Sequence, residues 1–144
     1  MKTITHSGPM ELVVVALEPD ELLLESIRQA VKDHDIRNGM VVSGIGTLKT
    51  CRMHYIKHTG IPSDNGFYTV EKPLEVLSIS GIVADGEPHL HVVCSCGESQ
   101  VYCGHLEPES KVCYLAEIAI LKCNEMGMTR TKDDRGLSLL GPKE

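Results

Sequence analysis

The alternation of apolar and polar positions divides the chain into one amphipathic helix and a series of strands. Residues 11–17 (ELVVVAL) form an apolar run of strand length, and Glu18-Pro19-Asp20 supplies turn and helix-start residues. Apolar residues then recur at helical spacing, at Leu23, Leu24, Ile27, Ala30 and Val31. We therefore predict one main helix over about residues 20–35, closed by Asn38-Gly39 as a left-handed stop.

The rest of the chain has the pattern of short strands separated by turn residues. The predicted strands span residues 40–45, 50–57, 66–71, 73–83, 88–96, 100–106 and 111–122. Strands this closely spaced pair antiparallel, because a parallel pair needs a long crossover. The sequence thus predicts an α+β fold, in which an antiparallel-rich β-sheet is flanked by the helix, in a single domain over residues 1–144.

Two glycine-containing segments are predicted to be turns rather than binding loops. The segment Ser43-Gly44-Ile45-Gly46-Thr47 leads into a strand, so it lacks the helix N-terminus that binds phosphate, and we expect a tight turn or a bulge. Asp133-Asp134-Arg135-Gly136 is expected to be a polar turn. The stretch from Met128 to Leu140 has a mixed pattern, and Lys143-Glu144 is expected to be a loose tail.

Composition indicates a globular protein with an aliphatic core. The chain has 144 residues, no Trp and one Phe, so Val, Ile, Leu and Met must fill the core. The N-terminus lacks a signal-peptide pattern and no apolar stretch reaches the length of a membrane span, so we expect a cytoplasmic protein with no membrane contact. Five of the six cysteines lie in predicted strands beside aliphatic residues, which is typical of reduced core thiols.

Net charge argues against nucleic-acid binding. The formal charge is −6, and the lysines and arginines are scattered along the chain rather than clustered. DNA-binding surfaces depend on a basic patch, because phosphate contacts and counterion release supply most of the non-specific affinity. On charge alone, this domain is a poor DNA binder.

Three histidines form the most specific candidate site. His89 and His91 point to the same face of a predicted strand, with Cα atoms about 6.5–7 Å apart, while Leu90 and Val92 face the core. The next strand brings in His105. Three neutral imidazoles with an open fourth position are typical of a Zn²⁺ site that holds water or a ligand. The alternative is that these histidines are solvated or hydrogen-bonded without a metal.

Other polar residues could join this site. Cys103 shares the orientation of His105 and could add a thiolate, although packing is the simpler interpretation. Glu117 lies on an otherwise apolar strand face and is a candidate catalytic acid or base near the metal, or an exposed partner for an arginine at a subunit contact. Glu75 raises the same question. His54 and His58 have no evident partner and are expected at the surface.

The order of motifs resembles the plants-and-prokaryotes-conserved (PPC) domain family. The motifs are VVSGIGTL (41–48), PLEVLSISG (73–81), DGEPHLHV (85–92), CGHL (103–106) and R-x₂-D-D-R-G-L-x-L-L (130–140). The resemblance implies an antiparallel-rich sheet flanked by helices and assembly as a homotrimer. It also implies that the histidines matching His89, His91 and His105 lie near a subunit boundary and sometimes bind a metal.

The same resemblance implies two classes of function. Plant members carry an AT-hook, which this chain does not contain, and prokaryotic relatives are often labelled DNA-binding by that association. The chain also departs from the family at Cys103, usually Gly, and at Cys94 and Cys96, in a strand where relatives often carry a further histidine. The first hypothesis is a DNA-binding or regulatory PPC protein with a three-histidine metal site.

The second hypothesis is a small metal-dependent lyase or hydrolase acting on a small-molecule ligand, with Glu117 or Glu75 handling the proton. Distant similarity to the zinc enzyme acetolactate decarboxylase supports it by analogy only. A third interpretation makes the histidines structural contacts in the trimer without a metal.

Overall fold

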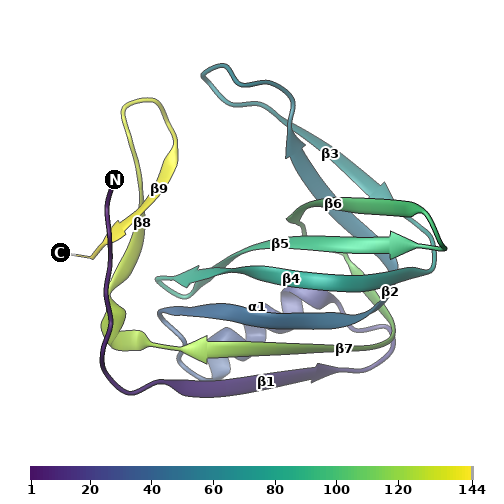
Figure 1. Ribbon diagram of the computed structural model, residues 1–144, viewed down its shortest axis with the longest axis horizontal. Helices are drawn as coiled ribbons and strands as arrows, with labels where there is room; N and C mark the ends of the chain where they lie inside the picture. Colours follow the sequence, from purple (N-terminus) through teal and green to yellow (C-terminus); the bar gives the residue numbers. More distant parts are fainter. Residues whose placement is uncertain (144) are drawn as a thin grey trace.

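The computed structural model of the protein describes residues 1–143. Its elements follow the predicted order, with one α-helix near the start and strands through the rest of the chain (Figure 1). They are β1 (Glu11–Leu17), α1 (Leu23–Asp33), β2 (Gly39–Ile56), β3 (Asn65–Val70), β4 (Leu74–Ala84), β5 (Glu87–Cys96), β6 (Gln100–Leu106), β7 (Lys111–Lys122), the 3₁₀-helix η1 (Asn124–Met126), β8 (Met128–Lys132) and β9 (Ser138–Pro142). The fold is consistent with the predicted α+β class, although strands dominate it.

Strand β2 organises the main sheet because it pairs with four other strands. The sheet order is β1-β7-β2-β4-β5-β6, and every pairing in it is antiparallel. The first half of β2 lies between β7 and β4, and its second half pairs with β3 and with β6. Since β6 also pairs with β5, the β2–β6 contact at Met53↔Leu106 and His54↔His105 curls the sheet back onto itself.

The two strands predicted at 40–45 and 50–57 are one continuous strand. The glycine-containing segment between them is irregular rather than a turn: the register between β2 and β7 shifts at Val41/Ser43 and again at Gly46/Leu48. Gly46 has a φ of 149°, and a Cβ there would lie 2.5 Å from the carbonyl oxygen of Leu115. Of the two predicted alternatives, the bulge is therefore confirmed.

Helix α1 covers one face of the sheet and supplies part of the core. Its buried residues, Leu23, Leu24, Ile27 and Val31, recur at the spacing that predicted the helix. In Figure 1 the helix lies behind β2 and β7, so it closes the inner face of the curled sheet. The two sides of the core are therefore the helix and the inward-pointing aliphatic residues of the strands.

The predicted helix end is wrong in its position. The helix ends at Asp33, and the left-handed residue after it is Asp35, with a φ of 46°, whereas Gly39 is the first residue of β2. Asn38 has a different role, because its side chain is buried. It donates to the carbonyl of Asn124 and accepts a hydrogen bond from the backbone N–H of Met128. That bonding ties the end of the chain to the start of β2.

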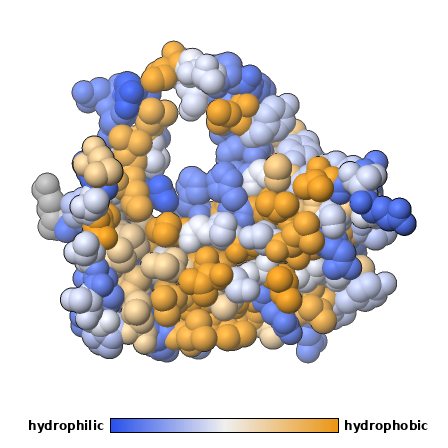
Figure 2. Space-filling view, viewed as in Figure 1, coloured by the Kyte–Doolittle hydropathy of each residue, from blue (hydrophilic) through white to orange (hydrophobic). Residues whose placement is uncertain are grey.

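The outer face of the sheet carries a group of exposed apolar side chains. It comprises Leu12, Val14, Val42, Ile45, Leu77 and Leu115, with exposed fractions of 46–64%. These residues come from β1, β7, β2 and β4, and we call them the outer apolar face. Figure 2, viewed from the side opposite the helix, shows hydrophobic residues gathered across these strands. Monomeric proteins rarely expose a contiguous patch of this kind without a partner.

The end of the chain forms a separate two-stranded hairpin. Strands β8 and β9 pair antiparallel, and the predicted polar turn at residues 133–136 connects them. Thr129 donates to the Asp85 carboxylate at 2.5 Å, and Lys143 forms an ion pair with the same carboxylate. The expected loose tail is thus wrong for Lys143, while Glu144 lies outside the described residues.

The structure contains neither a disulfide bond nor a membrane-spanning helix within residues 1–143. All six cysteines are free thiols, with Cys51, Cys94 and Cys123 buried and Cys103 exposed. In residues 1–143, no helix has the length and apolar character needed to cross a membrane.

Gly81 is expected to be essential for the close approach of β4 to β5. Its φ is 154°, and a Cβ at this position would lie 2.0 Å from the carbonyl oxygen of His89. Gly81→Ala should lower the free energy of unfolding by about 2–3 kcal/mol, because backbone must move to relieve the clash. Gly97→Ala is the control, since nothing lies within 4 Å of its Cβ; only the left-handed strain of about 1 kcal/mol applies. Equal losses in urea unfolding of the two variants would contradict this explanation.

Candidate functional site

Four histidines from three strands gather beside the β2–β6 contact. His89 and His91 lie on β5, His105 on β6 and His54 on β2. The register places His91 opposite His105 and His105 opposite His54. Leu90 and Val92, between and beside the β5 histidines, are almost fully buried. The prediction that the histidines face away from the core is therefore confirmed.

The three histidines predicted from sequence lie ring against ring. The ring centroids of His89 and His105 are 4.7 Å apart, those of His91 and His105 are 5.5 Å apart, and those of His89 and His91 are 5.6 Å apart. The rings of His89 and His91 are nearly parallel, at 12°, as expected for i and i+2 on one strand. Ring contacts at these distances bring imidazoles from two adjacent strands together at one region of the surface.

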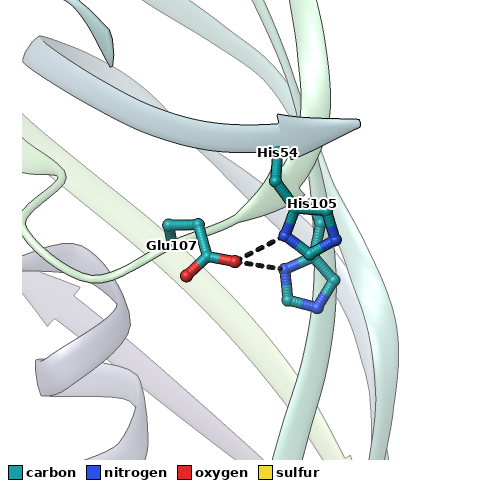
Figure 3. Close-up of side chains that lie close together, drawn as sticks. All are labelled: His54, His105 and Glu107. Carbon is teal, nitrogen blue, oxygen red and sulfur yellow. Dashed lines mark hydrogen bonds and ion pairs between the residues drawn. The ribbon is translucent and has the colours of Figure 1, made fainter. Parts of the chain in front are cut away.

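His54 and Glu107 extend this cluster on its other side. His54 stacks on His105 at 4.3 Å between centroids, and its Nδ1 lies 2.6 Å from Oε1 of Glu107 (Figure 3). Nδ1 of His105 lies 3.4 Å from the same oxygen. One donor atom from each of His54, His105 and Glu107 can be chosen so that all three lie within 4.8 Å of one another.

The distance between His54 Nδ1 and Glu107 Oε1 shows whether these two atoms could be ligands of one metal ion or are hydrogen-bonded to each other. Two ligands of one tetrahedral zinc ion, each about 2.0–2.1 Å from it, lie about 3.3 Å apart. The 2.6 Å contact between His54 and Glu107 is shorter and is a hydrogen bond, in which His54 donates when its proton is on Nδ1. Glu107 therefore orients His54, in the way that carboxylates orient metal-binding histidines.

His105 and Arg130 each have a buried nitrogen that makes no hydrogen bond, although Nδ1 of His105 lies 3.4 Å from Oε1 of Glu107. Within residues 1–143, three buried side-chain polar atoms lack a hydrogen bond, and two of them are Nδ1 of His105 and Nε of Arg130. Buried polar atoms are normally satisfied, so each of these atoms offers a position at which a water, an ion or a ligand can bind. The charge of Arg130 contributes to the lowered pKa of His89, whose ring packs against that of His105.

Burial lowers the pKa of two histidines, His89 and His105, and so keeps them neutral at pH 7. Burial lowers the pKa of His89 to about 4, and the positive charge of Arg130 adds to the effect, followed by the neighbouring histidines. Burial also lowers the pKa of His105, with a smaller contribution from His54. Neutral imidazoles carry the lone pair that a metal ion requires.

Glu117 and Glu75 lie away from the histidine cluster within this chain. Glu117 is exposed on β7, opposite Ala16 and Ile45, and both β2 and β4 separate β7 from β5 in the sheet order. Glu75 lies on β4 opposite Thr47 and lines a groove with Lys72 and Tyr114. Their roles as acid or base stay predictions. Cys103 is exposed opposite Val93, and the three neighbouring donor atoms described above do not include its thiol.

Sequence reasoning missed His54 and Glu107 for different reasons. His54 was expected at the surface without a partner, because its neighbours on β6 are about 50 residues away in the chain and no local pattern shows the pairing. Glu107 had a detectable signal, since it follows His105 by two residues and so shares its orientation.

Comparison with known proteins agrees with this fold. The chain matches the model of the Plants and Prokaryotes Conserved (PCC) domain, named PPC above, over residues 4–124. The chain belongs to this family. A PPC protein from Pyrococcus horikoshii has a structure with a TM-score of 0.78 and 26% identity, covering 97% of this chain and 99% of that one.

Two more distant structures show the same fold. The metal-containing protein from Archaeoglobus fulgidus has a TM-score of 0.80 at 23% identity, with coverage of 96% and 98%. A protein from Bacteroides thetaiotaomicron, provisionally named DNA-binding, has a TM-score of 0.80 at 17% identity, with coverage of 97% and 96%.

Two curated relatives match this chain over a small part of their own length. The Bifunctional protein GlmU of Synechococcus sp. (strain JA-2-3B'a(2-13)) is 24% identical over 126 residues, which are 88% of this chain and 19% of that protein. The chain thus spans about a fifth of the length of the curated relatives it matches.

The metal-free protein is expected to lose stability as the pH falls from 7 towards 4. The unfolded chain binds a proton at His89 with a pKa near 6.5, whereas the folded chain binds it only near pH 4. Between these values the unfolded state holds more protons, so acid favours unfolding. The loss should be on the order of 1 kcal/mol, because partial exposure of the ring screens the effect.

Urea unfolding at pH 7 and pH 5 measures this loss. His89→Gln removes the titrating group and should reduce the pH dependence, whereas His58→Gln, at an exposed position, should leave it unchanged. The same pH dependence in His89→Gln and in the unmodified protein would contradict the assignment.

Proposed function

We propose that this PPC protein is a divalent-metal-binding domain in which His89, His91 and His105 hold the ion. The observation that carries the proposal is the convergence of these histidines from β5 and β6, with ring centroids 4.7 Å, 5.5 Å and 5.6 Å apart. The lowered pKa values of His89 and His105 favour the neutral form of the imidazole, which is the form that binds a metal. The metal-containing relative from Archaeoglobus fulgidus supports the same interpretation.

Zinc is the expected ion. Imidazole ligands suit Zn²⁺, and three protein ligands leave one position for water or a ligand. Bound zinc lowers the pKa of such a water to about 7. His54 and Glu107 would hold His105 in place, His54 by stacking on its ring and Glu107 by orienting His54.

We also propose that the protein assembles as a homotrimer through the outer apolar face. The six apolar residues of this face lie on β1, β7, β2 and β4, and nothing else in residues 1–143 covers them. Outward-facing positions continue from this face across the sheet to the histidines. Val42 and Ser43 lie on β2, and Ser80 lies on the neighbouring strand β4. Ser80 pairs with His91 on β5, and His91 pairs with His105 on β6. A second copy on this face would place the metal site near a subunit boundary, as the family resemblance implies.

DNA binding or a regulatory role is the second candidate function. It is favoured by the provisional name of the Bacteroides relative. The formal charge of −6 opposes it, and four of the five arginines are already in ion pairs with acidic residues of the same chain. Counterion release needs free cationic side chains, so the metal site has more support than DNA contact.

A small metal-dependent enzyme, a lyase or hydrolase, is the alternative use of the same histidines. The carboxylate that contacts the cluster is Glu107 rather than Glu117 or Glu75. If Glu117 takes part, it does so from the outer face of β7, where a trimer partner would lie. This alternative shares the metal site with the first proposal, and the metal experiment below therefore tests both.

The metal site is tested by titrating Co²⁺ and Zn²⁺ into protein without an affinity tag and measuring bound metal by elemental analysis. One ion per chain is expected. His89→Ala, His91→Ala and His105→Ala should each abolish stoichiometric binding, because two remaining imidazoles hold zinc poorly. His54→Ala should weaken binding about 10–100-fold, the usual effect of removing a supporting group.

His58→Ala is the matched control, since His58 is an exposed histidine on the β2–β3 connection. It should bind metal as the unmodified protein does. Absence of bound metal in the unmodified protein, or an equal loss in His58→Ala, would overturn the proposed site.

The homotrimer is tested by the molar mass in solution, which should be three times the 15.8 kDa of one chain. Val14→Lys with Leu115→Lys should lower this mass, because both changes place buried charges in the proposed contact. Thr69→Lys, at an exposed polar position on β3, should have no effect. A monomeric mass for the unmodified protein would exclude the assembly.

A further inference from the structure

The guanidinium of Arg130 is unusual among the arginines of this chain. Arg28, Arg37, Arg52 and Arg135 each form an ion pair with an acidic residue. Within residues 1–143 Arg130 forms none, although it is partly buried and its Nε lacks a hydrogen-bond partner. Because an unpaired charge is costly to bury, an arginine held in this way is suited to a ligand of opposite charge.

The hairpin that carries Arg130 is fixed beside the start of β5. The backbone N–H of Met128 donates to the Asn38 side chain at 2.9 Å, and Thr129 donates to Asp85. Asp85 lies in the turn between β4 and β5, four residues before His89. Figure 1 shows the β8–β9 hairpin standing beside the end of β4 and the start of β5. Two hydrogen bonds therefore hold the hairpin against the start of β2 and the β4–β5 turn, and from there the charge of Arg130 contributes to the lowered pKa of His89.

Arg130 and Glu107 carry opposite charges that offset each other, so the net charge at this place is positive only when the proposed divalent ion is bound. The carboxylate in contact with the histidines is Glu107, and its Oε1 is bonded to His54. A divalent ion on the histidines would add two positive charges to that of Arg130. In a chain with a net charge of −6, this local excess of positive charge favours an anionic ligand.

The site is also accessible. Figure 2 shows an opening in the surface between the β8–β9 hairpin and the arm formed by the end of β2 and β3, with hydrophilic residues at its lower edge. His91 itself is exposed, and Ser80 beside it on β4 is exposed as well. The exposed His91 is therefore accessible to a small molecule.

We propose that Arg130 makes the histidine site a binding site for a small oxyanion, a carboxylate or a phosphate group. The planar guanidinium would bind two oxygens of the group, while the metal takes a further oxygen or a neighbouring group of the same ligand. This inference rests on the proposed metal site and adds the class of ligand to it. It fits both a small-molecule enzyme and a ligand-regulated domain.

The experiment follows the visible spectrum of the Co²⁺-loaded protein during titration with acetate, with inorganic phosphate and with neutral acetamide. Acetate or phosphate should change the spectrum and saturate, whereas acetamide should not. The tighter of the two anions identifies the preferred group. Arg130→Gln should weaken anion binding about tenfold or more, since it removes a charge-assisted pair of hydrogen bonds.

Two further variants make the result specific. Arg130→Lys should bind the anion with intermediate affinity, because it keeps the charge but loses the planar pair of donors. Arg135→Gln removes an arginine from the same hairpin that is already paired with Asp133, and should bind anions as the unmodified protein does. Equal anion affinity in Arg130→Gln, Arg130→Lys and the unmodified protein would overturn the inference.

Failure of the metal site and failure of the anion site give different results. If the unmodified protein binds no Co²⁺, the proposed metal function is wrong. The anions are then titrated into metal-free protein while the NMR signal of the Arg130 Nε–H is followed. A saturable shift of that signal would still support an anion site at Arg130. No shift at high anion concentration would exclude it.

Discussion

The contact between β2 and β6 is the constraint on which the rest of this structure depends. β2 is 18 residues long and passes from the middle of the sheet, between β7 and β4, to its far edge beside β6. Only a strand that bends can do this, and the register shifts around Gly44 and Gly46 provide the irregularity. Without this closure His54 would lie at a free edge, and His105 would have no ring stacked on its outer side.

The chemistry of the site follows from where the closure puts polar groups. The histidines of the cluster lie on the side of β2, β5 and β6 that faces away from the aliphatic core, and partial burial there keeps His89 and His105 neutral. The hairpin β8–β9 then brings a cation, Arg130, to a place where imidazoles already resist protonation. These features fit a metal with an anionic ligand better than they fit contact with a nucleic acid, whose binding would need a broad basic surface.

The predictions from sequence succeeded where a local pattern was sufficient. The strand i, i+2 rule placed His89 and His91 on the non-core face, and the helical spacing of Leu23, Ile27 and Val31 placed α1. They failed where the answer depended on distant residues. Asn38-Gly39 resembles a helix stop, yet the helix ends before it, because Asn38 is needed by Asn124 and Met128 at the other end of the chain. His54 was judged isolated for the same reason.

The sequence by itself determined the α+β class, the antiparallel pairing and the helix, together with the family to which the chain belongs. It also grouped three of the histidines, His89, His91 and His105, on the strand face away from the core. These properties depend on periodicity, turn residues and motif order, which act over a few residues at a time. Only the tertiary structure decided that β2 is one bent strand, that His54 and Glu107 join the cluster, and that Arg130 stands unpaired beside it. These depend on pairings between residues about 40 to 90 positions apart, whose partners are selected by the packing of the whole sheet and not by any local pattern.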